Sequence, residues 1–326
     1  MNDIKSMEDN KTKFMIVDGN SLGCRAALAF NPNYGKEDMK STKGIPTGTV
    51  VRFMNMFCKI LKEIEPTHIV VTWDTDTNTF RKQLDDSYKA NRQAIKDTVV
   101  FSDMYKQFQI IKLILEKIGI HSVNVQGFEG DDIVGSYAKV SKADKNYIIT
   151  GDRDSFQLVD NKTVVIYPKH GFKEINIVDE DYIKKEYELD TNQFISFKML
   201  QGDSSDNIKG IDGCGPKTAI KLLHKFGSAK NIYNAKNEEI LKESNKRVAA
   251  DIDNWRNRFD ILEKLVTIRK DVKLPYSYAK CKIKKLDWEA ALPYIEELNM
   301  NQLASKIRMH ELYGQDDNVE IQLELW

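Results

Sequence analysis

The sequence predicts an α/β protein in which a mostly parallel central sheet is flanked by helices and followed by a helical region. Two observations lead to this fold class. In the first half of the chain, short apolar segments alternate with longer segments of helical periodicity. After about Phe194, the chain has mainly helical character. We find no internal repeat and no low-complexity segment.

The predicted elements follow one another in a regular order. Residues 13–20 form an apolar run that ends in Asp-Gly, which predicts a buried strand leading into a loop. Further strands are predicted at 67–74, 120–125 and 146–154, and helices at 47–64, 104–119 and 131–142. Residues 260–275 predict a helix followed by an extended stop. Strands that alternate with helices form a parallel sheet covered on both faces.

Composition excludes several classes of protein. With 326 residues and 41% apolar content, the chain can form one large domain or two ordinary ones. It has no run of roughly 18 apolar residues and no secretory signal, so we expect a cytoplasmic protein without a membrane partner. The four cysteines and five histidines are scattered, which argues against a disulfide framework, a zinc site or a histidine-rich metal site.

The distribution of charge is compatible with nucleic-acid binding. The formal net charge is zero, yet five basic residues lie between Arg81 and Lys96, and five lysines lie between Lys209 and Lys230. A neutral total can therefore hide basic strips beside an acidic pocket.

Acidic residues follow the carboxyl ends of the predicted strands. They are Asp18, Asp74, the group Glu129, Asp131 and Asp132, and the pair Asp152 and Asp154. In open α/β sheets this edge binds ligands, and residues i and i+2 of an extended chain can point the same way. The alternative is that each acid serves an ordinary turn or helix cap. The recurrence at four strand ends favours a site.

Carboxylates that converge without histidine or cysteine select hard cations such as Mg²⁺ or Mn²⁺. Seven acids are too many for one ion. Two ions about 3.5–4 Å apart would use them, and this arrangement suits phosphodiester cleavage. The sequence therefore predicts a two-metal site.

The segment 202–228 predicts a helix-hairpin-helix that holds a DNA backbone. Gly213 and Gly215 suit a tight turn, and Pro216 suits the start of a helix, whose free N–H groups bind phosphate. Lys217, Lys221 and Lys225 follow on one helix face. Asp203 and Asp206 open the segment and can reach the acidic crevice. The alternative is an ordinary helical hairpin with a solvated lysine face.

A second basic segment, 80–93, follows Asp74. A helical turn would place Lys89 and Arg92 on one face, where they can orient a scissile phosphate and stabilise its charge. Tyr88 can stack on a base. A charged surface loop explains the composition equally well.

Together these motifs resemble the 5′ nuclease family, which includes flap endonucleases, phage 5′–3′ exonucleases and the 5′-nuclease domain of bacterial DNA polymerase I. The resemblance runs from about Lys13 to about Lys306. Its motifs are "VDGNS", "KGIPTG", Trp73-Asp74, "YKANR", "FEGDD", "TGDRD", "GDSSDNIKGIDGCGPKTA" and "TIRKDVKLP".

The resemblance implies a magnesium-dependent nuclease that cleaves 5′ flaps and degrades DNA or RNA-primed DNA from 5′ ends, in replication or repair. It implies a first metal at Asp18, Asp74, Glu129 and Asp131 with Asp132 close by, and a second at Asp152, Asp154, Asp203 and Asp206. Lys89 and Arg92 would project from a helical arch, with Arg81 and Tyr88 as further DNA contacts. A potassium ion would bind near Gly210 and Ile211.

The resemblance also predicts how the chain is divided into domains and tails. We expect a tail at 1–12, a PIN-like nuclease core at 13–200 with an arch at 80–103, a helical region at 201–313, and a tail at 314–326. Asp86, Lys209 and Asp212 stand where relatives often carry proline, so we expect a more flexible arch and a looser hairpin. We expect a free-standing monomer.

The final residues resemble the short peptide by which bacterial replication proteins dock into a sliding clamp. Gln322 would form hydrogen bonds, while Leu323, Leu325 and Trp326 would fill a pocket. The alternative is a tail that folds back on its own domain. For the whole protein, two other functions compete with nuclease activity: a junction-binding protein without cleavage, and a magnesium phosphohydrolase of small substrates.

Overall fold

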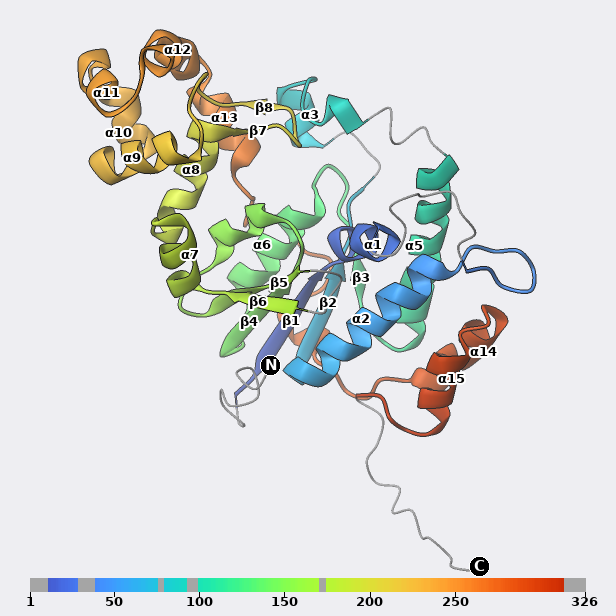
Figure 1. Cartoon of the computed structure of the whole chain (residues 1–326). Coiled ribbons are helices and arrows are strands. Elements are labelled where there is room, and N and C mark those ends of the chain that lie inside the picture. Colours follow the sequence, from blue (N-terminus) through green and yellow to red (C-terminus); the bar gives the residue numbers. More distant parts are fainter. Residues whose placement is uncertain (1–10, 29–38, 76–78, 93–98, 170–173, 314–326) are drawn as a thin grey trace, which may run out of the picture.

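The computed structural model describes residues 11–28, 39–75, 79–92, 99–169 and 174–313, and a six-stranded sheet lies at its centre (Figure 1). The strand order is β3-β2-β1-β4-β5-β6, with all neighbours parallel except β5 and β6. The strands are β1 Lys13–Asp18, β2 His68–Thr72, β3 Ser122–Val123, β4 Lys145–Ile149, β5 Thr163–Lys169 and β6 Glu174–Val178. The predicted mostly parallel sheet is confirmed.

Helices cover both faces of this sheet because its central strands are apolar on both sides. On β1, Met15 and Val17 pack into one core and Phe14 and Ile16 into another. The first core is closed by α1 Gly19–Leu28, α2 Gly48–Ile64, α5 Val99–Lys117, α14 Trp288–Glu297 and α15 Asn301–Arg308. The second is closed by α6 Gly130–Val140 and α7 Glu180–Tyr187, with the short 3-10 helices η2 Arg153–Leu158 and η5 Tyr278–Cys281.

A separate helical region has its own core around the buried Trp255. It contains η4 Thr191–Gln193, α8 Phe194–Gln201, β7 Gly202–Asp203, β8 Ile208–Lys209, α9 Pro216–Phe226, α10 Ala229–Asn234, α11 Asn237–Glu243, α12 Lys246–Asn257 and α13 Phe259–Val266. After α13 the chain returns to the nuclease core, where η5 lies beside β2, α14 packs against α5, and α14 and α15 pack against each other. The stretch 201–313 is therefore not one packing unit, since its last part completes the nuclease core.

The structure corrects one local prediction and confirms another. The loop expected after Asp18 is helix α1, which begins at Gly19 directly against β2: a Cβ on Gly19 would lie 2.6 Å from the Trp73 ring. The helix followed by an extended stop that is predicted at 260–275 is confirmed, since α13 ends at Val266 and Thr267 is extended. Within the arch segment, α3 spans Phe80–Leu84 and η1 spans Ala90–Arg92, whereas α5 already begins at Val99. In the described part of the chain, no helix is long and apolar enough to cross a membrane.

Candidate active site

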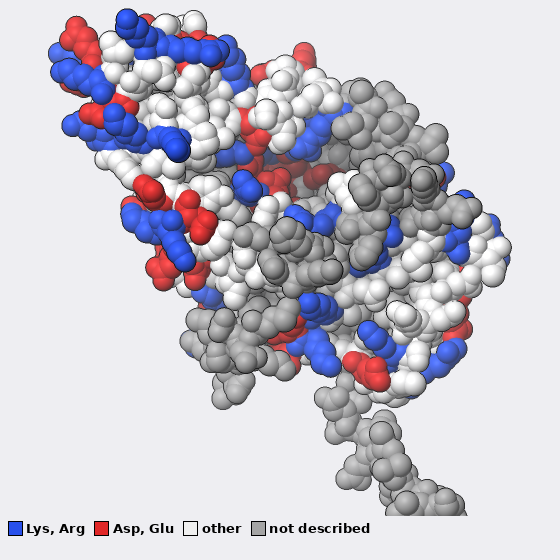
Figure 2. Space-filling view, in the orientation of Figure 1, with Lys and Arg blue, Asp and Glu red and all other residues white. Residues whose placement is uncertain are grey.

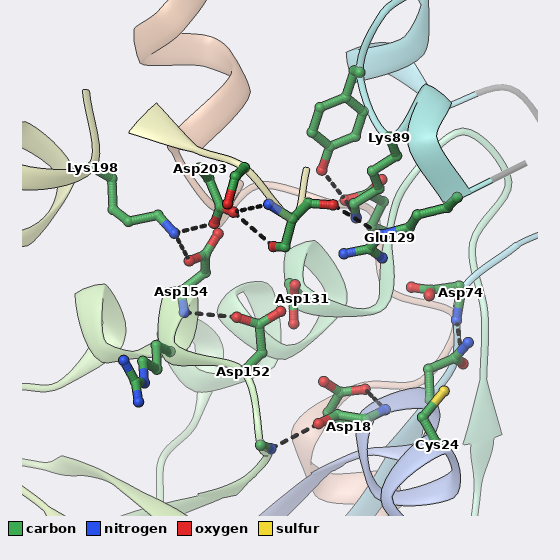
Figure 3. Close-up of a pocket in the computed structure, with 18 of the residues that line it drawn as sticks. Asp18, Cys24, Asp74, Lys89, Glu129, Asp131, Asp152, Asp154, Lys198 and Asp203 are labelled. Atoms are coloured by element: carbon green, nitrogen blue, oxygen red, sulfur yellow. Dashed lines mark hydrogen bonds and ion pairs between the residues drawn. The ribbon is translucent and has the colours of Figure 1, made fainter. Parts of the chain in front are cut away.

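The predicted acidic residues meet at the carboxyl edge of the sheet, where strand order reverses. Asp18 ends β1, Asp74 follows β2 and Asp152 follows β4, and these three strands are neighbours in the order β2-β1-β4. The chain passes from β1 to strands on either side of it, so a crevice opens at this point. Asp131 enters from the first turn of α6. Figure 3 shows these side chains pointing into one pocket from different elements.

Local hydrogen bonds hold the carboxylates in place. Asp18 accepts from the Ser21 N–H at 2.9 Å and from the Thr150 hydroxyl at 2.9 Å. Asp74 accepts from the Gly130 N–H at 2.7 Å, and a Cβ on Gly130 would lie only 3.1 Å from that same oxygen. Backbone groups at the starts of α1 and α6 therefore position acids that come from the strands.

Burial and mutual repulsion disfavour the charged form of these carboxylates. Burial raises the pKa of Asp18 to about 7, with a further contribution from Asp74. Burial also raises the pKa of Asp131 well above its ordinary value, followed by the charges of Asp18, Asp152 and Asp74. Close carboxylates that resist ionisation gain most from a cation between them. The oxygen-only donor set fits Mg²⁺ or Mn²⁺, although among the described residues no three such side chains already surround a common point as ligands.

A lysine that sequence analysis missed joins the second group of acids. Lys198 of α8 contacts Asp154 at 2.6 Å and also forms an ion pair with Asp203 (Figure 3). Burial raises the pKa of Asp154 to about 6. Burial alone would raise the pKa of Asp203, but hydrogen bonds from Lys198 and Ser205 bring it to about 2. The sequence hint was the position of Lys198 on a helix that leads directly into Asp203.

The predicted catalytic cations reach the site. Lys89 donates to Glu129 at 3.0 Å and lies 3.6 Å from Asp206. Arg92 forms an ion pair with Asp206. Burial would lower the pKa of Lys89, but the neighbouring acids, Glu129 first, raise it well above its ordinary value. Lys89 therefore stays charged in the pocket.

Two predicted site residues have a structural role instead. Asp132 is fully buried, and both of its oxygens are used by a bidentate contact with Arg81 at 2.7 and 2.8 Å, together with the N–H groups of Arg269 and Glu129. Arg81 also donates to the Leu265 and Thr267 carbonyls. The metal role predicted for Asp132 and the DNA contact predicted for Arg81 are therefore wrong, because neither side chain has a free face.

Tyr88 is also placed differently from its prediction. Its ring is only 3% exposed, so a base cannot stack on it. Its hydroxyl donates to Glu129 at 2.9 Å, with Asp206 at 3.2 Å. Asp206 is buried beside Tyr88, Lys89 and Arg92 rather than among the unpaired acids. The stacking prediction is wrong, and Asp206 faces the arch.

The hairpin lies at the far end of the same cleft. A cleft of about 1410 Å³ runs from Asp18 and Asp74 past Lys198 to Pro216 and Ile220 at the start of α9. Gly213 has a left-handed φ of 78°, and Gly215 faces open space. Figure 2 shows acidic side chains at the floor of the hollow and basic side chains along the neighbouring helical region.

The remaining hairpin predictions have mixed outcomes. Lys217 and Lys225 are exposed, whereas Lys221 pairs with Glu243 at 3.4 Å. Asp212 does not loosen the hairpin as predicted, because Arg247 contacts its carboxylate at 2.8 Å and Asp251 accepts its N–H. The Ile211 carbonyl accepts from Cys214 N–H at 3.0 Å, and the potassium site there stays a prediction. The predicted clamp residues Gln322, Leu323, Leu325 and Trp326 lie outside the described residues.

The raised carboxylate pKa values predict a pH dependence of the metal-free protein. Asp18 and Asp154 bind protons more tightly folded than unfolded, because burial disfavours their charge. Their contribution to the free energy of unfolding is complete below the unfolded pKa of about 4. It is lost as the pH rises through about 7. Urea unfolding in EDTA from pH 5 to 8 measures this, and Asp18→Asn is expected to flatten the profile. Stability that rises over this range would contradict the prediction.

Comparison with known proteins gives family and structural matches. Residues 13–188 match the family model described as 5′-3′ exonuclease, N-terminal resolvase-like domain, and residues 189–289 match 5′-3′ exonuclease, C-terminal SAM fold. DNA polymerase I of Lactococcus lactis subsp. cremoris (strain MG1363) is 33% identical over 306 residues, which cover 92% of this chain and 33% of that protein. DNA polymerase I of Bacillus subtilis (strain 168) is 30% identical over 299 residues, covering 91% and 32%. The chain spans about a third of the length of these curated relatives.

Solved structures share the fold. T5 5′-exonuclease with bound zinc ions superposes with a TM-score of 0.64 at 19% identity, covering 91% of this chain and 98% of that one. Flap endonuclease-1 from Methanococcus jannaschii gives 0.59 at 15% identity, covering 91% of each chain. The catalytic core of Rad2 in complex with a DNA substrate gives 0.58 at 18% identity, covering 95% and 94%. The predicted fold class, a mostly parallel core with a helical C-terminal region, is confirmed.

Proposed function

The chain belongs to the 5′-3′ exonuclease family, and from this premise we propose that it is a divalent-metal-dependent, structure-specific 5′ nuclease. Its substrates would be 5′ flaps, nicks and 5′ ends of DNA or RNA-primed DNA. The observation that carries the proposal is the cleft itself. Buried and half-buried acids that repel one another lie at one end, and the start of α9, with its exposed lysines, lies at the other.

The acids fit two hard cations. Asp18, Asp74, Asp131 and Glu129 would hold one, and Asp152, Asp154 and Asp203 the other. Bound there, two Mg²⁺ or Mn²⁺ ions would activate a water molecule and offset charge on the phosphate and the leaving oxygen. Glu129 and Asp203 would exchange their present partners, Lys89 and Lys198, for this role.

The chain's own cations would hold the reacting phosphate. When Lys89 and Arg92 leave Glu129 and Asp206, their charges remain in the pocket and can bind the non-bridging oxygens of the scissile phosphate. The hairpin would hold the duplex by its phosphates, through the free N–H groups of α9 and through Lys217 and Lys225. Two of the structural neighbours, T5 flap endonuclease and the catalytic core of Rad2, are complexes with DNA.

A product map tests the proposal. Flap, nicked and blunt duplexes that carry a 5′ label are incubated with Mg²⁺ and either the wild-type chain or Asp152→Asn. We expect short 5′ products from the flap with the wild type, and loss of these products with the variant. A junction-binding protein without cleavage would retard the flap but yield no product with either chain. A small-substrate phosphohydrolase would neither retard nor cut it.

Lys89→Met is expected to lower the single-turnover cleavage rate on the order of a hundredfold, because it removes a charge that stabilises the transition state. Flap affinity should change little, since the hairpin supplies most backbone contacts. Quench-flow cleavage and fluorescence anisotropy measure the two quantities. Lys106→Met, on the surface of α5, is the control. A variant with the wild-type rate would exclude Lys89 from the reaction.

Several predictions extend the proposal beyond the site. We propose that the protein acts in replication or repair, such as primer removal, and that it works as a cytoplasmic monomer. The tail at 322–326 would bind a sliding clamp. The aromatic and leucine side chains of that peptide fit an anchor-in-pocket mode.

A further inference from the structure

Two motifs that are distant in sequence are joined side by side next to the pocket. We call residues 87–92 the arch foot and residues 203–207 the β7–β8 turn. The Asn207 side-chain amide donates to the Ser87 carbonyl at 2.7 Å. The Asn91 side-chain amide donates to the Ser204 carbonyl at 3.1 Å, across 113 residues of sequence. Neither of these two bonds involves an acidic side chain. Each asparagine side chain links its own segment to a backbone carbonyl of the other segment.

A backbone bond fixes Lys89 within this junction. The Lys89 N–H donates to the Asp206 carbonyl at 2.9 Å. Lys89 has a left-handed φ of 54°, and Asn207 has one of 58°. Asparagine adopts this conformation readily, but a lysine keeps it only when its surroundings hold it. The junction therefore sets the backbone from which the Lys89 side chain enters the pocket.

The arch foot packs with the DNA-binding side of the molecule. Tyr88 belongs to the hydrophobic core of the helical region, together with Ile208, Ile211 and Cys214 of the hairpin. The β7–β8 turn leads through Ile208 directly into that hairpin. If the hairpin shifts when a duplex binds, the shift would therefore move Tyr88 through the shared core and Lys89 through the β7–β8 turn.

We propose that Asn91 and Asn207 are positioning residues that couple the seating of a DNA backbone on the hairpin to the placement of Lys89. This inference rests on the proposed function and adds to it a physical link between substrate grip and the catalytic cation. The two asparagines act through Lys89 and do not touch the substrate. Without them the hairpin can still bind DNA, but binding no longer orders the arch foot.

The test separates binding from positioning. Asn207→Gly removes the amide and keeps the left-handed backbone, and Asn91→Ala removes the second amide. Asn299→Gly is the matched control, since Asn299 also has a left-handed φ, of 57°, in the turn between α14 and α15. The double variant should keep flap affinity within about twofold and lose roughly tenfold in single-turnover rate, as expected for a misplaced group. Adding Lys89→Met should then cost clearly less than it costs in the wild type.

Hydrogen exchange supplies a readout without metal or catalysis. In EDTA, adding flap DNA should increase protection of the amides of residues 87–92 in the wild type and in Asn299→Gly, but not in the double variant. Equal protection in all three chains, or an undiminished effect of Lys89→Met, would overturn the inference while wild-type cleavage still supports the proposed function. A wild type that binds flap DNA with ordering of the arch foot yet never cleaves would overturn the function and leave the coupling standing.

Discussion

Asp131→Asn is expected to reduce flap cleavage by on the order of a thousandfold or more, while raising the stability of the metal-free protein. The two effects share a cause. Asp131 is half-buried in the cleft, and its charge is opposed first by desolvation and then by Asp18, Asp152 and Asp74. A neutral amide relieves this repulsion, so the free energy of unfolding rises. The same change weakens the cation site, and with it the charge stabilisation on which the reaction depends.

The two halves of this prediction are measured separately. Thermal unfolding in EDTA at pH 8, where the wild-type cluster is most strongly charged, should give a higher Tm for Asp131→Asn. Single-turnover cleavage with saturating Mg²⁺ should give the loss of rate. Asp181→Asn, at an exposed position in the first turn of α7, controls for the loss of any one acid. A variant that cleaves at the wild-type rate would exclude Asp131 from the metal site.

Arg81→Met is expected to destabilise the protein by about 3–5 kcal/mol. Arg81 is 3% exposed, and its partner Asp132 is fully buried. Without the guanidinium, Asp132 would keep a buried charge with only backbone donors, and the Leu265 and Thr267 carbonyls would lose their donor. The contact also joins α3 to α6 and to the segment after α13. The substitution therefore loosens three elements that surround the cleft.

A second substitution distinguishes a buried ion pair from a mere loss of packing. Arg81→Met combined with Asp132→Leu should be more stable than Arg81→Met alone, because it removes the uncompensated charge. Urea unfolding at pH 7 measures both. Arg247→Met is the control: its ion pair with Asp212 is exposed, so we expect little loss of stability. If Arg81→Met costs no more than this control, the structural role assigned to Arg81 is wrong.

Much of the fold could be predicted because its signals are local. The buried strands can be recognised as apolar runs. The acids that follow them can be identified without knowing any distant partner. Asp18, Asp74, Asp131 and Asp152 were predicted and do lie together in the cleft. Helix α1 was missed because Asp-Gly normally favours a turn; here position 19 is glycine because the Trp73 ring leaves no room for a Cβ at the start of the helix. Lys198 was missed because its position on the helix leading into Asp203 is a weak signal until the fold brings Asp154 beside it.

The strand pattern, the excess of acids at one sheet edge and the glycine turn before α9 can all be inferred from the sequence alone. Which charged side chains remain available for a ligand depends on contacts between distant elements. Asp131 and Asp132 are adjacent and chemically identical, but successive residues of a helix point about 100° apart. One therefore enters the cleft, and the other meets Arg81 in the core. Tyr88 and Lys89 also differ although both donate to Glu129, 40 or more residues away: Tyr88 is buried in the core of the helical region, whereas the Lys89 side chain is partly exposed in the pocket.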